Sequence, residues 1–271
     1  MQIDELKEIS KKIRINIIEQ VYNAKSGHPG GSLSSADILT ALYFNEMNIN
    51  PSEPRCKTRD RFVLSKGHAA PVLYATLAER GFFEKKELFN LRKIDSILQG
   101  HPDMNKVPGV DMTTGSLGQG LSVANGMAIS AKLDKLSYRV YCLLGDGEIE
   151  EGQIWEAAMT SSHYKLDNLC VIVDNNNLQI DGTIDKVMNS YPIDEKFKSF
   201  GFNVININGN NIEEILQAFE MAKNTKGKPT AIIAKTIKGK GVSYMENQVG
   251  WHGKAPDKEE YEEAIKELES N

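Results

Sequence analysis

Several features of secreted, membrane-spanning and nucleic-acid-binding proteins are missing from this sequence of 271 residues. It has only three cysteines, Cys56, Cys142 and Cys170, whose odd number and wide spacing leave neither a disulfide framework nor a four-thiolate zinc site. No apolar run approaches the roughly 20 residues of a membrane-spanning helix. The formal net charge of -5 argues against a general nucleic-acid binder, which normally carries a basic excess. We therefore expect neither a membrane nor a nucleic acid as a partner.

The start of the chain gives no sign of export. The segment MQIDELKEIS places acidic residues where a signal peptide needs basic residues and an apolar stretch. A composition of 40% hydrophobic and 25% charged residues is ordinary for a globular protein, and neither a repeat nor a linker interrupts the chain. We expect a cytoplasmic protein in which residues 1–271 form one domain.

Common nucleotide and calcium motifs are also missing. No G-x-x-x-x-G-K-[ST] occurs, and a G-x-G-x-x-G that begins at Gly118 fails because position 123 is Val. A calcium-binding EF-hand loop that begins at Asp174 fails as well, since Gln179 stands where the turn requires glycine. A nicotinamide-dependent dehydrogenase is therefore disfavoured.

Helical periodicity dominates the first half of the chain. Apolar residues recur there at three- and four-residue steps, which predicts amphipathic helices. The predicted helices cover 4–25, 35–47, 71–80, 84–91 and, after a loop-rich stretch, 121–136.

In the second half, short apolar or β-branched runs alternate with helical patterns. The predicted strands are 139–144, 169–173, 203–207 and 230–236, and the predicted helices are 153–164, 193–200, 212–223 and 257–270. Almost continuously apolar strands that alternate with helices are typical of a parallel sheet buried on both faces. The predicted fold class is therefore α/β, a doubly wound, mostly parallel sheet with helices on both faces.

Polar and glycine-rich segments follow the predicted strands, where such sheets bind their ligands. Asp146 and Asn176 each come just after a strand, and their side-chain oxygens are hard ligands suited to Mg²⁺ or Ca²⁺. Gly145 and Gly147 flank the aspartate and allow backbone amides to approach an anion closely. Alternatively, Asp146 caps the following helix and Asn176 lies in a turn. The spacing alone does not name a cofactor.

Four of the five histidines adjoin glycine in loop-like segments: His28, His68, His101 and His252. This pattern predicts imidazoles presented from turns into a shared cleft. Near neutral pH an imidazole donates, accepts or shuttles protons, which suits chemistry on hydroxyl and carbonyl groups.

Together these segments resemble one enzyme family. GDGEIEEG followed by DNNNLQIDG resembles the thiamine diphosphate fingerprint. SGHPGGSLSSADIL, DRFVLSKGHAAPVLY, TTGSLGQGLSVANGMA, KTIKGKGVSYMEN and WHGKAP narrow the resemblance to transketolase and spread it over residues 26–256. Enzymes similar to pyruvate dehydrogenase or deoxyxylulose-phosphate synthase share the GDG core but would not be expected to carry SGHPG and TTGSLGQG in this form.

The resemblance implies a thiamine-diphosphate-binding fold and a role for each matching residue. Asp146 and Asn176 match side-chain ligands of Mg²⁺ or Ca²⁺, and Leu178 matches a ligand that gives its backbone carbonyl. The implied cofactor-binding residues are His68, Gly115, Ser116, Leu117, Gly147, Asn176 and His252. The implied catalytic histidines are His28, His68, His101 and His252. Glu151 and Glu156 match acidic residues at a subunit interface, or alternatively form an exposed first helical turn.

The sequence departs from the family in three ways. Ser116 stands where the family often has proline, and GDGEIEEG is more acidic after the aspartate than in many members. Neither change removes a ligand atom, so we expect altered loop stiffness. The third departure is length, because the pyrimidine-binding and carboxyl-terminal domains of full transketolases are absent from residues 1–271. A separate carboxyl-terminal subunit is therefore expected, in an α₂β₂ heterotetramer.

The implied reaction transfers a two-carbon ketol unit from a ketose phosphate to an aldose phosphate, and the chain alone is expected to be inactive. Two alternatives remain open: a subunit of a related thiamine diphosphate enzyme with a different sugar or 2-oxo acid substrate, and a non-catalytic cofactor-binding module. The presence of Asp146, Asn176 and the loop histidines argues against the module, because binding alone needs fewer of them.

Overall fold

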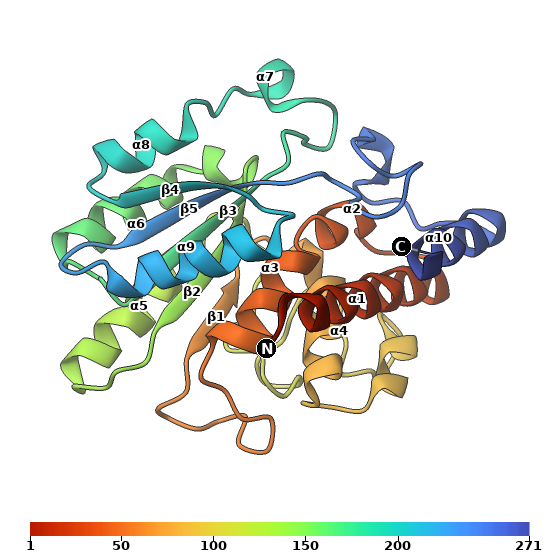
Figure 1. The fold of residues 1–271 in the computed structure, drawn as a ribbon, viewed down its shortest axis with the longest axis horizontal. Helices are drawn as coiled ribbons and strands as arrows, with labels where there is room; N and C mark the ends of the chain where they lie inside the picture. The colour runs from red at the N-terminus through yellow and green to blue at the C-terminus, as the bar shows by residue number, and fades with distance from the viewer. Residues whose placement is uncertain (271) are drawn as a thin grey trace.

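The fold is built on a five-stranded, all-parallel sheet with the order β1-β2-β3-β5-β4 (Figure 1). The computed structural model describes residues 1–270, so the last residue of the predicted domain 1–271 lies outside the described residues. The strands are β1 (Arg61–Leu64), β2 (Val140–Gly145), β3 (Leu169–Asn175), β4 (Asn203–Asn208) and β5 (Thr230–Lys235). Gly145 at the end of β2 pairs with Asp174 near the end of β3, so the segments after these strands emerge side by side.

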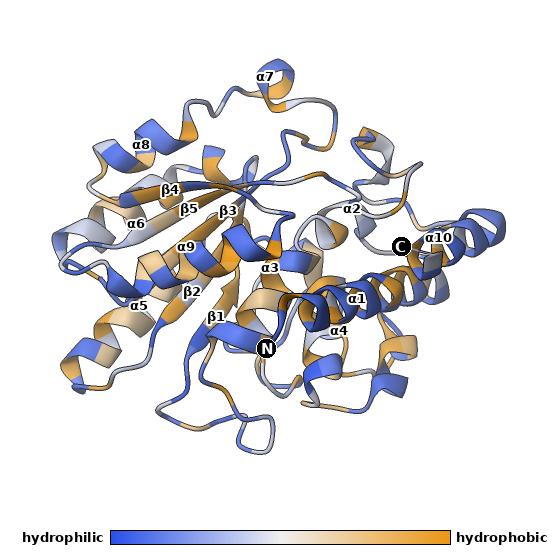
Figure 2. Ribbon diagram, in the orientation of Figure 1, coloured by the Kyte–Doolittle hydropathy of each residue, from blue (hydrophilic) through white to orange (hydrophobic). Residues whose placement is uncertain are grey.

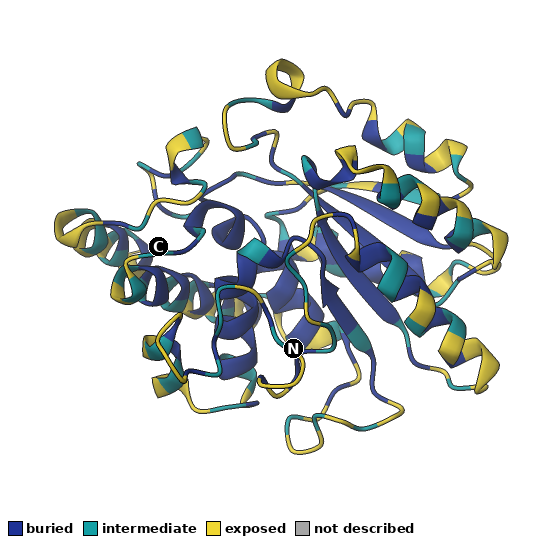
Figure 3. Cartoon of the chain, turned by 180° about the vertical axis from the view of Figure 1, so that it is seen from behind, coloured by how far each residue is buried: buried dark blue, intermediate teal, exposed yellow. Residues whose placement is uncertain are grey.

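Helices cover both faces of the sheet, which confirms the predicted fold class. One face packs against α1 (Ile3–Ala24), α3 (Ala36–Ala41), α4 (Ala70–Arg80) and α9 (Ile212–Asn224). The other face packs against α5 (Gly120–Leu133), α6 (Gly152–His163) and α8 (Ile193–Ser199). Strands β1, β2, β3 and β5 are mostly apolar (Figure 2) and mostly buried (Figure 3), as expected for strands covered on both sides. In the edge strand β4, apolar residues alternate with asparagines, and the strand is partly exposed.

Local signals explain how the longer helices begin and pack. In α1, Ile13, Ile17 and Val21 lie on one buried face, and Gln2 with Glu5 forms a capping box at its start. The last helix, α10 (Lys258–Ser270), packs along α1. Among residues 1–270, every helix is too short or too polar to cross a bilayer.

The structure corrects several predicted elements. The predicted helix 35–47 continues beyond α3 as a π-helical turn (Leu42–Glu46), and the predicted helix 84–91 is a 3₁₀ helix (Lys85–Asn90). Strand β1 and the short helices α2 (Pro29–Leu33) and α7 (Ile184–Val187) were not predicted, because four or five residues show too little periodicity. As a consequence of β1, Ser65 and Lys66 lie at the ligand-binding edge of the sheet.

Candidate functional site

The carboxyl ends of the strands and the loops that follow them enclose a cavity of about 410 Å³. This volume is typical of small-molecule sites, which span roughly 300–1,000 Å³. The predicted residues that line it are His28, His68, Gly115, Leu117, Asp146, Gly147, Glu151, Asn176, Leu178 and His252. His101, Ser116 and Glu156 are exposed and do not line this cavity.

Asp146 is a buried carboxylate that forms no direct ion pair with the described residues, although the charges of Lys66 and Lys238 act on it from nearby. It is 3% exposed, and its oxygens accept the N–H groups of Gly147 (3.0 Å) and Asn177 (2.6 Å). No side chain among residues 1–270 forms an ion pair with it. Burial and the nearby charge of Asp174 raise the pKa of Asp146 to about 7. Since neither oxygen bonds to α6, Asp146 does not cap that helix.

The other two predicted metal ligands lie beside it. The Asn176 amide nitrogen donates to Asp174 (3.3 Å), and its Oδ1 accepts the Leu178 N–H (3.1 Å), so Asn176 also makes the turn considered above. Residues 1–270 contain no cluster of three His, Cys, Asp or Glu side chains suited to a metal. The available donors are instead a carboxylate, an amide oxygen and a carbonyl, a set that fits Mg²⁺ completed by water or phosphate oxygens.

Three of the four predicted histidines converge on the cavity. The ring centroids of His28, His68 and His252 are 5.2–5.4 Å apart. Burial and neighbouring positive groups lower the pKa of His28 to about 4 and that of His252 to about 3, and they also lower the pKa of His68. These imidazoles are therefore neutral at pH 7, and the buried Nδ1 of His28 has no partner within residues 1–270.

His101 lies outside this group of three rings. A Cβ added at Gly115 would lie 3.2 Å from Cγ of His101, so the imidazole packs directly on the predicted cofactor loop. Burial and Arg92 lower its pKa as well.

Comparisons with known proteins agree with this geometry. Residues 6–271 match the family described as transketolase, thiamine diphosphate binding domain. The chain belongs to the transketolase family. It is of the transketolase type, a class of transferase, and the matched part is a thiamine diphosphate binding domain. The resemblance read from the motifs is thereby confirmed.

Some members of the transketolase family have the length of this chain, and others are much longer. The chain is 47% identical to an apulose-4-phosphate transketolase subunit of Phocaeicola vulgatus, covering 99% of this chain and 95% of that protein. It is 44% identical to the 6-deoxy-6-sulfo-D-fructose transketolase subunit SqwG of a Clostridium species, and this match covers 99% of this chain and 97% of that protein. The Campylobacter jejuni transketolase structure superimposes with a TM-score of 0.93 at 36% identity, over 99% of this chain but 43% of that one.

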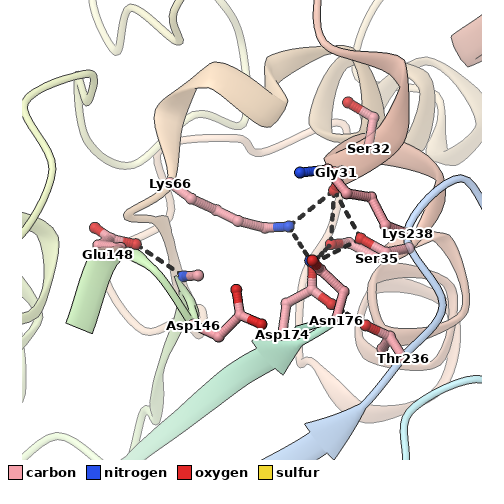
Figure 4. A network of polar contacts seen from close by, with 12 residues as sticks. Gly31, Ser32, Ser35, Lys66, Asp146, Glu148, Asp174, Asn176, Thr236 and Lys238 are labelled. Atoms are coloured by element: carbon pink, nitrogen blue, oxygen red, sulfur yellow. Dashed lines mark hydrogen bonds and ion pairs between the residues drawn. The ribbon is translucent and has the colours of Figure 1, made fainter. Parts of the chain in front are cut away.

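A buried ion pair that the sequence did not reveal supports the site of this transketolase-type chain (Figure 4). Lys66 Nζ lies 2.5 Å from Asp174 Oδ2 and donates to the Gly31 carbonyl at 2.8 Å. Ser34 and Thr236 donate to the same carboxylate, which also accepts the Asn176 amide. Although burial alone would raise it, Lys66 and these donors hold the pKa of Asp174 below its usual value. Asp174 thus fixes the orientation of Asn176.

Lys238 is a second functional residue to which the sequence gave no role. It is 2% exposed, and its Nζ contacts the Leu178 carbonyl (3.2 Å) and His252 Nδ1 (2.9 Å). Burial lowers the pKa of Lys238 to about 8. Its position in a glycine-rich segment directly after β5 was the available signal, because that segment lies at the ligand-binding edge.

Of the remaining predicted residues, Gly147, Leu117 and Glu151 line the cavity, whereas Ser116 and Glu156 do not. A Cβ at Gly147 would lie 2.9 Å from Gln179 Cγ, so a larger residue would crowd the floor beside Asp146. Ser116 and Leu117 are exposed in the loop that precedes α5. Glu151 occupies the N-cap position of α6 without a capping hydrogen bond, and Glu156 is exposed one turn further on. Their role at a subunit interface stays a prediction.

Proposed function

We propose that this chain is the amino-terminal subunit of a two-chain transketolase, which moves a two-carbon ketol unit from a ketose phosphate to an aldose phosphate. The observation that carries the proposal is Asp146, a buried carboxylate that forms no ion pair within the described part of the chain and lies beside Asn176 and three neutral imidazoles. Thiamine diphosphate supplies the carbanion chemistry of such a reaction when bound. The chain's own residues would bind the cofactor, orient the sugar substrate and exchange protons with it.

Asp146, Asn176 and the Leu178 carbonyl would hold Mg²⁺, or alternatively Ca²⁺. The raised pKa of Asp146 supports this assignment, because a divalent cation supplies the positive charge that favours its ionised form. Gly147, with the loop from Gly115 to Leu117, would pack against the cofactor.

The histidines would handle the sugar hydroxyls and protons. Because the pKa values of His28 and His252 are low, both rings offer one donor and one acceptor nitrogen at pH 7. The unpartnered Nδ1 of His28 is an available hydrogen-bonding atom in this group. His68 would contact the cofactor, and His101 would act from the rim.

A carboxyl-terminal subunit would complete the active site in an α₂β₂ heterotetramer. The chain corresponds to 43% of a full transketolase, and two relatives of matching length are named as subunits. Ile180, which is 66% exposed, and the exposed Glu151 both line the cavity. We place the enzyme in the cytoplasm, where its three free thiols would stay reduced.

Two measurements test the proposal. Calorimetry of the purified chain with thiamine diphosphate should show binding that needs Mg²⁺ and disappears in Asp146→Ala. Ketol transfer should then require a second polypeptide that carries the carboxyl-terminal domains. Robust transfer by this chain alone would contradict the proposed division into two chains, and metal-independent binding would contradict the ligand assignment.

A second candidate differs only in its substrate. Relatives of matching length are named for apulose 4-phosphate and 6-deoxy-6-sulfo-D-fructose, which favours an unusual sugar for this chain as well. Assaying the assembled enzyme against ketose phosphates and a sulfonated ketose would separate the two candidates by their kcat/KM values.

A further inference from the structure

Glu148 is a buried carboxylate that the proposed chemistry does not use. It lies two residues after Asp146 and is 3% exposed (Figure 4). Its Oε1 accepts the Ser65 hydroxyl (2.5 Å) and the Gly118 N–H (3.0 Å), and its Oε2 accepts the Gly145 N–H (2.9 Å). One side chain therefore joins the ends of β1 and β2 to the loop before α5.

The Gly115–Gly118 loop has few other attachments. Within residues 1–270, the bond from Gly118 to Glu148 is the only hydrogen bond between 115–118 and a segment distant in sequence. The flanking backbone packs tightly, since a Cβ at Gly67 would lie 2.7 Å from the Gly115 nitrogen. A Cβ at Gly120 would likewise lie 2.8 Å from the Ser65 Cα. Close packing thus holds the loop, including that of His101 on Gly115 and of Glu151 on Gly118, and one carboxylate supplies its only long-range hydrogen bond within residues 1–270.

We propose that Glu148 is a positioning residue that locks this loop at a fixed distance from Asp146 and Gly147. All three of its partners are donors, so the geometry calls for an acceptor at both oxygens. A glutamine of the same size would turn an N–H₂ group toward one of these donors and lose that hydrogen bond. The loop would then sample positions that no longer match the β2–α6 turn. The effect on the cofactor rests on the proposed function, whereas the effect on the loop does not.

The decisive experiment measures loop order and cofactor affinity separately in the full chain. In Glu148→Gln, amide hydrogen exchange of peptides spanning 115–123, without cofactor, should be at least tenfold faster than in the wild type. The Kd for thiamine diphosphate with Mg²⁺ should rise about tenfold. Ser65→Ala removes one of the three donors and should shift both quantities in the same direction by less. If Glu148→Gln does not fold, the loop exchange and the Kd of Ser65→Ala decide whether Glu148 positions the loop.

Asp60→Asn is the matched control, because Asp60 is also a buried carboxylate that accepts two backbone N–H groups, those of Asn48 and Arg139, at the opposite end of β1. It should leave loop exchange and Kd within twofold of the wild type, even though it lowers the melting temperature. Unchanged exchange in Glu148→Gln, or an equal rise in Asp60→Asn, would overturn the role of Glu148. A wild-type chain that fails to bind thiamine diphosphate would count against the proposed function, and the exchange data would still decide the role of Glu148.

Discussion

At the amino end of the sheet, the Asp111 carboxylate lies 2.5 Å from Arg59 Nη2 and accepts the Phe62 N–H at 2.9 Å. At the carboxyl end, Asp146 has two backbone donors and forms no ion pair among the described residues. Both side chains are at most 6% exposed. The first carboxylate has a direct positive partner, although burial still raises its pKa. The second feels Lys66 and Lys238 only at longer range and forms no ion pair within residues 1–270, which leaves its oxygens open to a ligand.

Removing the Asp146 carboxylate should have the largest effect on binding. We expect Asp146→Ala to raise the Kd for thiamine diphosphate and Mg²⁺ more than a thousandfold, about 4 kcal/mol, since the main anionic ligand is lost. Calorimetry at pH 7.5 checks this. A loss of affinity of the same size in Asp111→Asn would contradict the assignment of cofactor binding to the carboxyl end of the sheet alone.

The reverse pattern is expected for stability. Asp111→Asn leaves Arg59 buried without its negative partner, which should lower the free energy of unfolding by about 3 kcal/mol. Urea denaturation of the cofactor-free protein measures this. Arg59→Gln, which removes the positive partner instead, should cost a similar amount. A change below about 0.5 kcal/mol in both variants would contradict the stabilising role.

The pH dependence sharpens the contrast. Because the pKa of Asp146 is raised from 3.8 to about 7, the folded state holds its proton more tightly than the unfolded state does. Stability is therefore lost as the pH rises from about 4 to 7. At pH 8, in metal-free buffer, Asp146→Asn should be more stable than the wild type by about 1–2 kcal/mol. This is less than the full shift implies, because Asn offers one fewer acceptor for the N–H groups of Gly147 and Asn177. At pH 4, where the wild-type carboxyl is protonated, only the cost of the lost acceptor remains, so Asp146→Asn should unfold at a lower urea concentration than the wild type.

The smallest expected effect concerns His28. Its pKa is lowered from 6.5 to about 4, so the unfolded state binds a proton first as the pH falls. Stability is then lost between pH 6.5 and 4. In His28→Asn, the melting temperature should fall about 2 °C less between pH 7 and pH 5 than in the wild type. An equal fall in melting temperature between pH 7 and pH 5 in the two proteins would show that His28 does not titrate in this way.

The sequence was sufficient to predict the sheet and the neighbouring positions of Asp146 and Asn176. Both follow from long apolar strands, whose carboxyl ends must meet at one edge of a parallel sheet. Strand β1 escaped prediction because its four residues are too few for a periodic signal. The pair of Lys66 with Asp174 escaped because its partners are 108 residues apart and meet only once β1 lies beside β2. Spacing along the chain carries no information about such a contact.

The Lys238 ammonium donates to the Leu178 carbonyl, the oxygen that we assign to the divalent cation. Two positive charges would repel strongly at one oxygen in a buried site, so a cation bound there would displace the lysine from that carbonyl. Lys238 would then keep His252 as a neighbour and become available to an anion. On this proposal the lysine is a placeholder that gives the carbonyl a hydrogen-bond donor until a cation takes its place.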